Sequence, residues 1–288
     1  MSGKLYAELS FDGKTVRLDT GKAAGPCLCI ASGGIEGWYS TPDAKVSMTE
    51  MQTGDGAHAV QESSILYGAR TVTVNWAAFS IDRESALAGD LALLSTAHRL
   101  VRLRIVDGSS DTFVVGYAQV GADAAVASNG MTGTLTVVCP DPRRYSTEAS
   151  RVQLLSGSAV SGGLSYGGGD GLAYQLTYGD DPESLQNVAT IANSGTSTAY
   201  PAITVNGPMN GGFRIDWDGG SVAYSQPVRG VPLALDCLTR TASVGGLDTS
   251  RHLTSRGFPS IPPGGSITIN LQASGTGWAT VEWRDTYI

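Results

Sequence analysis

The sequence predicts a mainly β protein in two parts: a first part with one α-helix, and a second part that forms a β-sandwich or jelly roll. Three observations predict this fold class. Glycine accounts for 38 of 288 residues, which favours many turns and few long helices. Short segments in which apolar and polar residues alternate recur along the chain, as in half-buried strands. Only one segment has the apolar spacing of a helix.

Four strands are predicted in the first part. In the first two the apolar residues occupy every second position, so that one face of the strand can be buried. The other two look like strands as well. The four segments are RTVTVNW (70–76), LVRLRIV (100–106), DTFVVGYAQV (111–120) and GTLTVVC (133–139).

The predicted helix lies between the first two of these strands, in IDRESALAGDLALLSTAHRL (81–100). Asp82 can cap its first turn, and Gly89 weakens it by about 1 kcal/mol relative to alanine. His98 is expected to complete a helix face or the C-terminal end rather than to act as a base. The residues at helical spacing are Leu87, Leu91, Leu94 and His98.

Two further features organise the chain. Residues 43–64 fit neither the helix nor the strand period, and connections of that length are usually functional or disordered. A domain boundary is predicted at about residue 150, which divides the chain into 1–150 and 151–288. All four lysines precede it, only arginines follow it among the basic residues, and CPDPRRYSTEAS (139–150) ends the preceding strand with two prolines.

The second part consists of strands separated by Gly, Pro, Asn and Asp turns. Their spacing suits a two-sheet sandwich or a jelly roll. The segments are NSGTSTAYPAITVNGP (193–208), the hairpin GFRIDWDGGSVAY (212–224), VPLALDC (231–237), RTASV (240–244), GSITINLQ (265–272) and WATVEWRD (278–285).

Charge and composition limit the possible partners. The net charge is −7 and the pI is near 4.9, so the free protein is a poor non-specific ligand for nucleic acid or anionic membrane. No apolar run is long enough to cross a bilayer, and the N-terminus does not resemble a signal peptide. We expect a protein made in a cytoplasm and kept there, or packed into a particle assembled there. The four cysteines lack metal-ligand spacing and are expected to be reduced and buried.

No catalytic or cation-binding motif is decisive. Asp216 and Asp218 in RIDWDGG share a strand face and could act as the carboxylate pair of a glycosidase, but a DGG turn also explains Asp218. GGGDG (167–171) and GDDPES (179–184) could hold a cation, or form a flexible link and a solvated turn. The three histidines (His58, His98 and His252) show no paired spacing. The sequence therefore predicts no enzyme, no metal and no cofactor.

Arginines cluster in the strand that follows the helix. Arg99, Arg102 and Arg104 fall within six residues, and the last two share a face. Nucleic acid is one interpretation; pairing with carboxylates of a neighbour is favoured by the acidic total. The same two interpretations apply to Arg143 and Arg144.

Seven motifs in series resemble the distal tail protein, a minor tail protein, of long flexible-tailed (siphovirus-type) bacteriophages. The resemblance covers nearly the whole chain in the family's order. The motifs are GGIEGWYSTPDAK, YGARTVTVNW with its Gly-x-Arg, the helix followed by LVRLRIVDG, CPDPRRYS, GGLSYGGGDGLAYQLTYG, NSGTSTAYPAITVNGP, and LALDCLTRTASVGG with the closing PPGGSITINLQASGTGWATVEWRDTYI.

The resemblance implies a structural virion protein. The first domain would be a tail-tube-like β-sandwich with one helix, and six copies would form a ring at the distal end of the tail. That ring would join the major tail tube protein to the tip or baseplate hub, and DNA would pass through its lumen without specific binding. The second domain would be a galectin-like sandwich outside the ring. Contacts with the ring or tube are expected at Met48, Met51, His58, Arg102 and Arg104.

Two other functions remain open. A carbohydrate-binding module that attaches to a host-surface glycan would need an exposed aromatic residue beside polar side chains, and Trp217, Tyr224 and Trp278 are available in the second part. Each of them could equally pack in a core or a ring contact. A cell-wall hydrolase is the third possibility.

Overall fold

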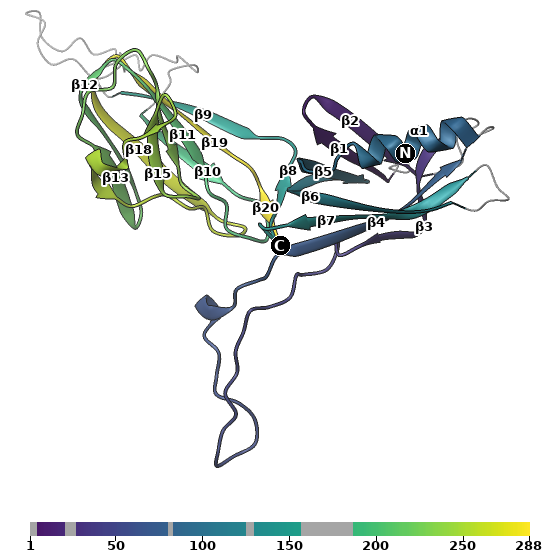
Figure 1. Cartoon of the computed structure of the whole chain (residues 1–288). Coiled ribbons are helices and arrows are strands. Elements are labelled where there is room, and N and C mark those ends of the chain that lie inside the picture. The colour runs from purple at the N-terminus through teal and green to yellow at the C-terminus, as the bar shows by residue number, and fades with distance from the viewer. Residues whose placement is uncertain (1–4, 21–26, 80–82, 125–129, 157–186) are drawn as a thin grey trace, which may run out of the picture. The chain divides into compact units, whose positions relative to one another are not determined.

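The computed structural model describes residues 5–20, 27–79, 83–124, 130–156 and 187–288. Asp82 and the segments 167–171 and 179–184, where a helix cap and cation sites were considered, lie outside these residues. The chain divides into two compact units, Met1–Thr147 with Tyr287–Ile288, and Glu148–Thr286 (Figure 1). None of the described helices has the length and apolar character needed to span a membrane.

The first unit is built on one nine-stranded sheet in the order β20-β8-β6-β5-β1-β2-β3-β4-β7. β6 also pairs with β7, so the seven strands from β6 to β7 close into a barrel-like sheet whose interior holds the core. The four predicted strands are confirmed as β4 to β7. The bounds are β1 (Tyr6–Phe11), β2 (Lys14–Asp19), β3 (Cys27–Glu36), β4 (Arg70–Phe79), β5 (Leu100–Asp107), β6 (Ser110–Ala124), β7 (Met131–Cys139), β8 (Arg144–Ser146) and β20 (Thr286–Tyr287).

The alternating residues of these strands point into the barrel. Val72, Val74 and Trp76 of β4 are fully buried, and so are Val101 and Leu103 of β5. The residues between them are more exposed. Burying one face of each strand is the pattern that the sequence predicted.

The predicted helix is present as α1 (Arg83–Leu94), but its row of leucines is not the face that packs on the sheet. Leu93 is fully buried, whereas Leu87, Leu91 and Leu94 are 41%, 63% and 44% exposed. Gly89 faces the sheet, because a Cβ on it would lie 3.4 Å from the Ala78 Cβ. The glycine that weakens the helix therefore marks the side of the helix that faces the sheet.

The second unit is a sandwich of two antiparallel sheets, as the strand spacing predicted. One sheet has the order β10-β18-β12-β13-β17 and the other β16-β15-β14-β11-β19-β9. The bounds are β9 (Ser150–Leu155), β10 (Val188–Ala192), β11 (Ala202–Asn206), β12 (Met209–Trp217), β13 (Gly220–Tyr224), β14 (Leu233–Asp236), β15 (Thr241–Val244), β16 (Leu247–Asp248), η2 (Ser250–His252), β17 (Leu253–Arg256), β18 (Ser266–Gly275) and β19 (Trp278–Trp283).

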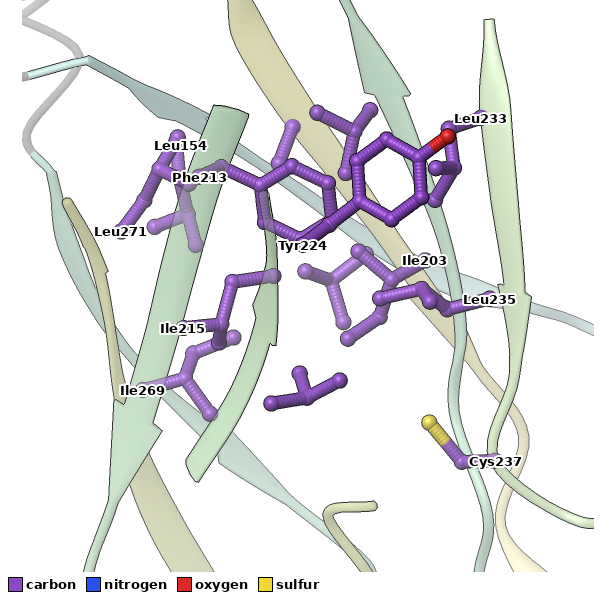
Figure 2. Close-up of a cluster of buried hydrophobic side chains, with 14 of the residues drawn as sticks. Leu154, Ile203, Phe213, Ile215, Tyr224, Leu233, Leu235, Cys237, Ile269 and Leu271 are labelled. Carbon is purple, nitrogen blue, oxygen red and sulfur yellow. The ribbon is translucent and has the colours of Figure 1, made fainter. Parts of the chain in front are cut away.

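One apolar cluster fills the space between the two sheets (Figure 2). Phe213, Ile215 and Ile269 come from the five-stranded sheet, and Ile203 and Leu235 come from the six-stranded sheet. All of them are less than 5% exposed. The sandwich is therefore held by side chains from both inner faces.

The Asn-Ser-Gly turn before β11 is hydrogen-bonded to the C-terminal end of the chain. The Asn193 side chain donates to the Ser197 carbonyl at 2.7 Å and accepts from the N–H groups of Gly195 and Thr286 at 3.0 and 3.2 Å. A Cβ on Gly195 would lie 2.0 Å from the Thr286 carbonyl oxygen. Asparagine and glycine are therefore needed here to hold the end of the chain, beyond their role in turning it.

Candidate assembly surfaces

The long connection between β3 and β4 forms a two-stranded extension, which we call the arm (residues 41–69). Figure 1 shows it projecting from the barrel as two antiparallel segments. Four backbone hydrogen bonds of 2.6–2.9 Å join them: Lys45 to Leu66, Gly68 to Asp43, Met51 to Gly56 and His58 to Thr49. Its one regular element is the short 3-10 turn η1 (Glu62–Ser64).

None of the described side chains of the arm is buried, yet several are large and apolar. Met48 and Met51, which were predicted as contact residues, lie here with exposed His58. The exposed apolar side chains and their exposed fractions are Met48 66%, Met51 42%, Val60 37%, Ile65 44% and Leu66 61%.

Arg70 fixes the base of the arm. This side chain is 1% exposed. Its Nε donates to the Pro142 carbonyl at 2.7 Å, and its Nη1 donates to the carbonyls of Gly37 and Ser40 at 2.7 and 2.8 Å. Burial lowers its pKa to about 10, so it stays charged at neutral pH. The Gly-x-Arg motif contained this residue, but the spacing gave no sign that it holds the strand leading into the arm.

The leucine face of α1, defined as Leu87, Leu91 and Leu94, is the second exposed apolar surface of this unit. The three residues are spaced i, i+4 and i+7 and therefore lie on one side of the helix. His98 is exposed just beyond the helix end, with φ of 60°. It lies four residues beyond Leu94 in the turn that follows, so the prediction that it completes the helix face or its C-terminal end is wrong.

The arginines of β5 already have partners within the chain. Arg104 makes two hydrogen bonds to Asp111, at 2.8 and 2.6 Å, and lies 3.6 Å from Glu8. This bonding raises the pKa of Arg104 and lowers that of Asp111. Arg102 lies over the ring of Phe113, 3.7 Å from its centroid. The acidic composition favoured pairing with carboxylates of a neighbour. Arg104 instead pairs with carboxylates of its own unit.

The two arginines of the PDPRRYS segment differ in their surroundings. Arg143 makes two hydrogen bonds to Asp141, at 2.8 and 2.9 Å. Arg144 lies over the Trp38 ring, 5.5 Å from its centroid. Burial lowers the pKa of Arg144.

A neutral polar surface, which we call the threonine face, covers the outward positions of β4, β7 and residues 117–123 of β6. Thr73 and Thr136 are cross-strand partners, with their hydroxyl oxygens 3.5 Å apart. No lysine or arginine occupies an outward position in these three segments. The outward residues are Thr71, Thr73, Asn75, Thr132, Thr134, Thr136, Val138, Tyr117, Gln119, Gly121 and Asp123.

The three aromatic residues considered for sugar binding have different environments. Tyr224 is 7% exposed and stacks on Phe213 in the core, so its ring cannot form a surface platform. Trp217 packs against the same core. Trp278 is 36% exposed, and its cross-strand partners are Asn206 and Leu155.

The carboxylates considered for catalysis are not arranged as a pair. Asp216 accepts a hydrogen bond from Arg214 Nε at 2.6 Å, and Asp218 lies in the turn between β12 and β13. Among the described residues, no group of three or more His, Cys, Asp or Glu side chains could hold a metal ion. Cys29, Cys139 and Cys237 are buried.

The fold has counterparts among solved structures, although no protein-family model and no curated protein sequence matches the chain. The SPP1 Dit (gp 19.1) protein, described as a paradigm of the hub adsorption apparatus in phages that infect Gram-positive bacteria, aligns with a TM-score of 0.63 at 12% identity. The alignment covers 98% of this chain and 99% of that one. The phage P2 baseplate in its activated conformation with Ca aligns with a TM-score of 0.42 at 12% identity, over 98% of both chains. The chain therefore shares the fold of SPP1 Dit.

Proposed function

We propose that this chain is a structural protein of the tail tip of a siphovirus-type phage, a distal tail protein whose copies form a ring between the tail tube and the hub. The observation that carries the proposal is the fold agreement with SPP1 Dit over nearly all of both chains. It includes both units in the same order, and the sequence motifs point to the same family independently.

The arm supports self-assembly. An exposed apolar extension without a core is unstable in water unless a partner covers it. Met48 and Met51 are adaptable apolar contacts, and Arg70 fixes where the arm leaves the barrel. We therefore assign the arm, with Met48, Met51 and His58, to contacts with a neighbouring subunit or with the tube.

The threonine face supports the passage of DNA. A channel that conducts a polyanion should offer neither a row of cations, which would hold it, nor an apolar wall. The outward positions of β4, β7 and the paired part of β6 are mostly threonine, asparagine and glutamine, and the one charged group among them is Asp123. We assign this face to the lumen of the ring.

Light scattering followed by negative-stain microscopy tests the proposal on the full chain. A hollow six-fold ring of about 179 kDa, six times the 29.8 kDa of one chain, is the expected particle. A variant that lacks residues 46–62 keeps the base of the arm and is expected to stay folded but monomeric. Rings formed without the arm would remove its assigned role. A monomer that also fails to bind tail tube and hub proteins would overturn the whole proposal.

One observation favours glycan binding by the second unit as a second function. Trp278 is exposed on the outer face of the six-stranded sheet. Thr204, Asn206 and Thr280 share that face, which places an aromatic ring beside hydroxyl and amide groups. A glycan array probed with the full chain tests this, with Trp278→Ala and the distant surface variant Leu247→Ala compared. A flat response, or equal signals from both variants, removes this function.

A further inference from the structure

We infer that Asn210 is a site of spontaneous covalent modification, at which the side-chain amide is lost and aspartate or isoaspartate takes its place. The inference does not depend on the proposed function, because it rests on the chemistry and the surroundings of one dipeptide in the second unit. Asn210 precedes Gly211 in β12. In an Asn-Gly pair the backbone nitrogen of the glycine reaches the asparagine side chain easily, because no Cβ stands in its way.

The reaction needs only the chain and water. The backbone nitrogen of Gly211 attacks the side-chain amide carbon of Asn210 and gives up its proton, and the bond from that carbon to the amide nitrogen breaks to release ammonia. The product is a five-membered succinimide ring. Water then adds to one of the two ring carbonyl carbons and opens the ring to aspartate or isoaspartate. Nothing is oxidised or reduced, and a neutral amide is exchanged for a negative charge.

The structure places this pair in an irregular part of the sheet. The register of β12 with β18 shifts between Met209 and Phe213, where three residues of β12 lie opposite the single residue Ser274. A bulge disrupts the hydrogen-bonded ladder and leaves its extra residue unpaired. Both Asn210 and Gly211 are exposed to water, and a Cβ on Gly211 would approach only the Ser274 hydroxyl, at 3.3 Å. The backbone nitrogen therefore has room to move toward the amide.

The side chain of Asn210 is also free to turn toward that nitrogen. Other asparagines of the second unit are held by hydrogen bonds: Asn187 donates to Asn270 Oδ1 at 3.0 Å, and Asn193 donates to the Ser197 carbonyl at 2.7 Å. Asn210 makes no such bond to any described residue. Its rotamer is therefore not fixed away from the reactive one.

A second Asn-Gly pair in the same unit provides a contrast. Asn206 ends β11 in regular register with Trp278. A Cβ on Gly207 would lie 2.1 Å from the Val228 carbonyl oxygen, so the backbone of this glycine is packed against another segment and has little room to move. We therefore expect Asn206 to keep its amide in the folded protein. The third pair of the sequence, Asn129–Gly130, begins outside the described residues.

Peptide mass spectrometry of the full chain tests this inference. The folded protein is kept in mildly alkaline buffer at 37 °C, and amide loss is followed at Asn210 and Asn206 over time. Loss at Asn210 is expected to be severalfold faster, with isoaspartate among the products, and the two rates should converge in urea because unfolding frees both pairs. If Asn210 keeps its amide as long as Asn206 does, the inference is overturned. A difference that persists unchanged in urea would come from local sequence and would overturn the role of the bulge.

Two variants test the attack by the Gly211 nitrogen. Asn210→Ser removes the reacting amide and should abolish the change at this position. Gly211→Ala, whose Cβ meets only the serine hydroxyl, should stay folded and lose the Asn210 amide severalfold more slowly than the wild type. An unchanged rate in Gly211→Ala, or aspartate formed without isoaspartate, would show direct hydrolysis and overturn the mechanism. Neither variant alters the arm or the threonine face, so a failure here leaves the proposed function standing.

Discussion

Replacing Arg70 by methionine should destabilise the first unit and release the base of the arm. The guanidinium donates three hydrogen bonds of 2.7–2.8 Å to the carbonyls of Pro142, Gly37 and Ser40. A hydrogen bond to a charged group contributes about 1.5–3 kcal/mol, but water can replace part of this at the half-buried carbonyls. We therefore expect a loss of about 3 kcal/mol in the free energy of unfolding, and new protease cleavage within the arm.

Urea unfolding at pH 7, followed by tryptophan fluorescence, measures the loss as a shift of the midpoint at constant slope. The matched control is Arg17→Met, because Arg17 contacts Asp19 on the surface with its side chain 46% exposed. Such pairs contribute about 0–1 kcal/mol. If Arg70→Met changes stability no more than Arg17→Met does, the clamp does not hold the arm and the reasoning fails.

Three further outcomes follow from the contacts described above. Gly195→Ala should destabilise the second unit by more than 2 kcal/mol in thermal unfolding, because its Cβ would lie 2.0 Å from the Thr286 carbonyl oxygen; Gly211→Ala, which meets only a flexible serine hydroxyl at 3.3 Å, should cost less than half as much. Asp111→Asn should cost about 1 kcal/mol at pH 7. Arg104 holds the pKa of Asp111 below its usual value of 3.8, so this stability is present above pH 4 and is lost as the pH falls below it; a cost that persists at pH 2 would contradict the pairing. The three buried cysteine thiols should react with a thiol reagent only after unfolding, and rapid labelling of any of them in the native protein would refute their burial.

Alternation predicted the strands because each strand has one buried face. In RTVTVNW and LVRLRIV the side chains expected to face inward are buried, among them Val72, Val74 and Leu103. Closure of the sheet was not predictable in this way. It depends on β6, whose 15 residues pair with β5 along one part and with β7 along another. The period of a strand says which residues are buried, but it does not say which strands are neighbours.

The helix shows a second limit of prediction from apolar periodicity. Spacing identified a row of leucines, and the structure leaves that row exposed while Gly89 and Leu93 face the sheet. Periodicity detects an apolar face but does not say whether the chain's own core or another molecule covers it. The small residue was the better guide, because Gly89 lies on the side of the helix that faces the sheet.

Arg70 connects the fold to the proposed assembly. Burying a guanidinium removes its hydration and leaves its Nη2 without a partner among the described residues, which is costly. In return it fixes the carbonyls of residues 37–40, where the chain leaves the barrel for an arm that contributes nothing to either core. The three hydrogen bonds to backbone carbonyls offset that cost. Fixing this segment has a use if the direction of the arm matters, and that direction matters only when the arm must meet a surface outside its own unit.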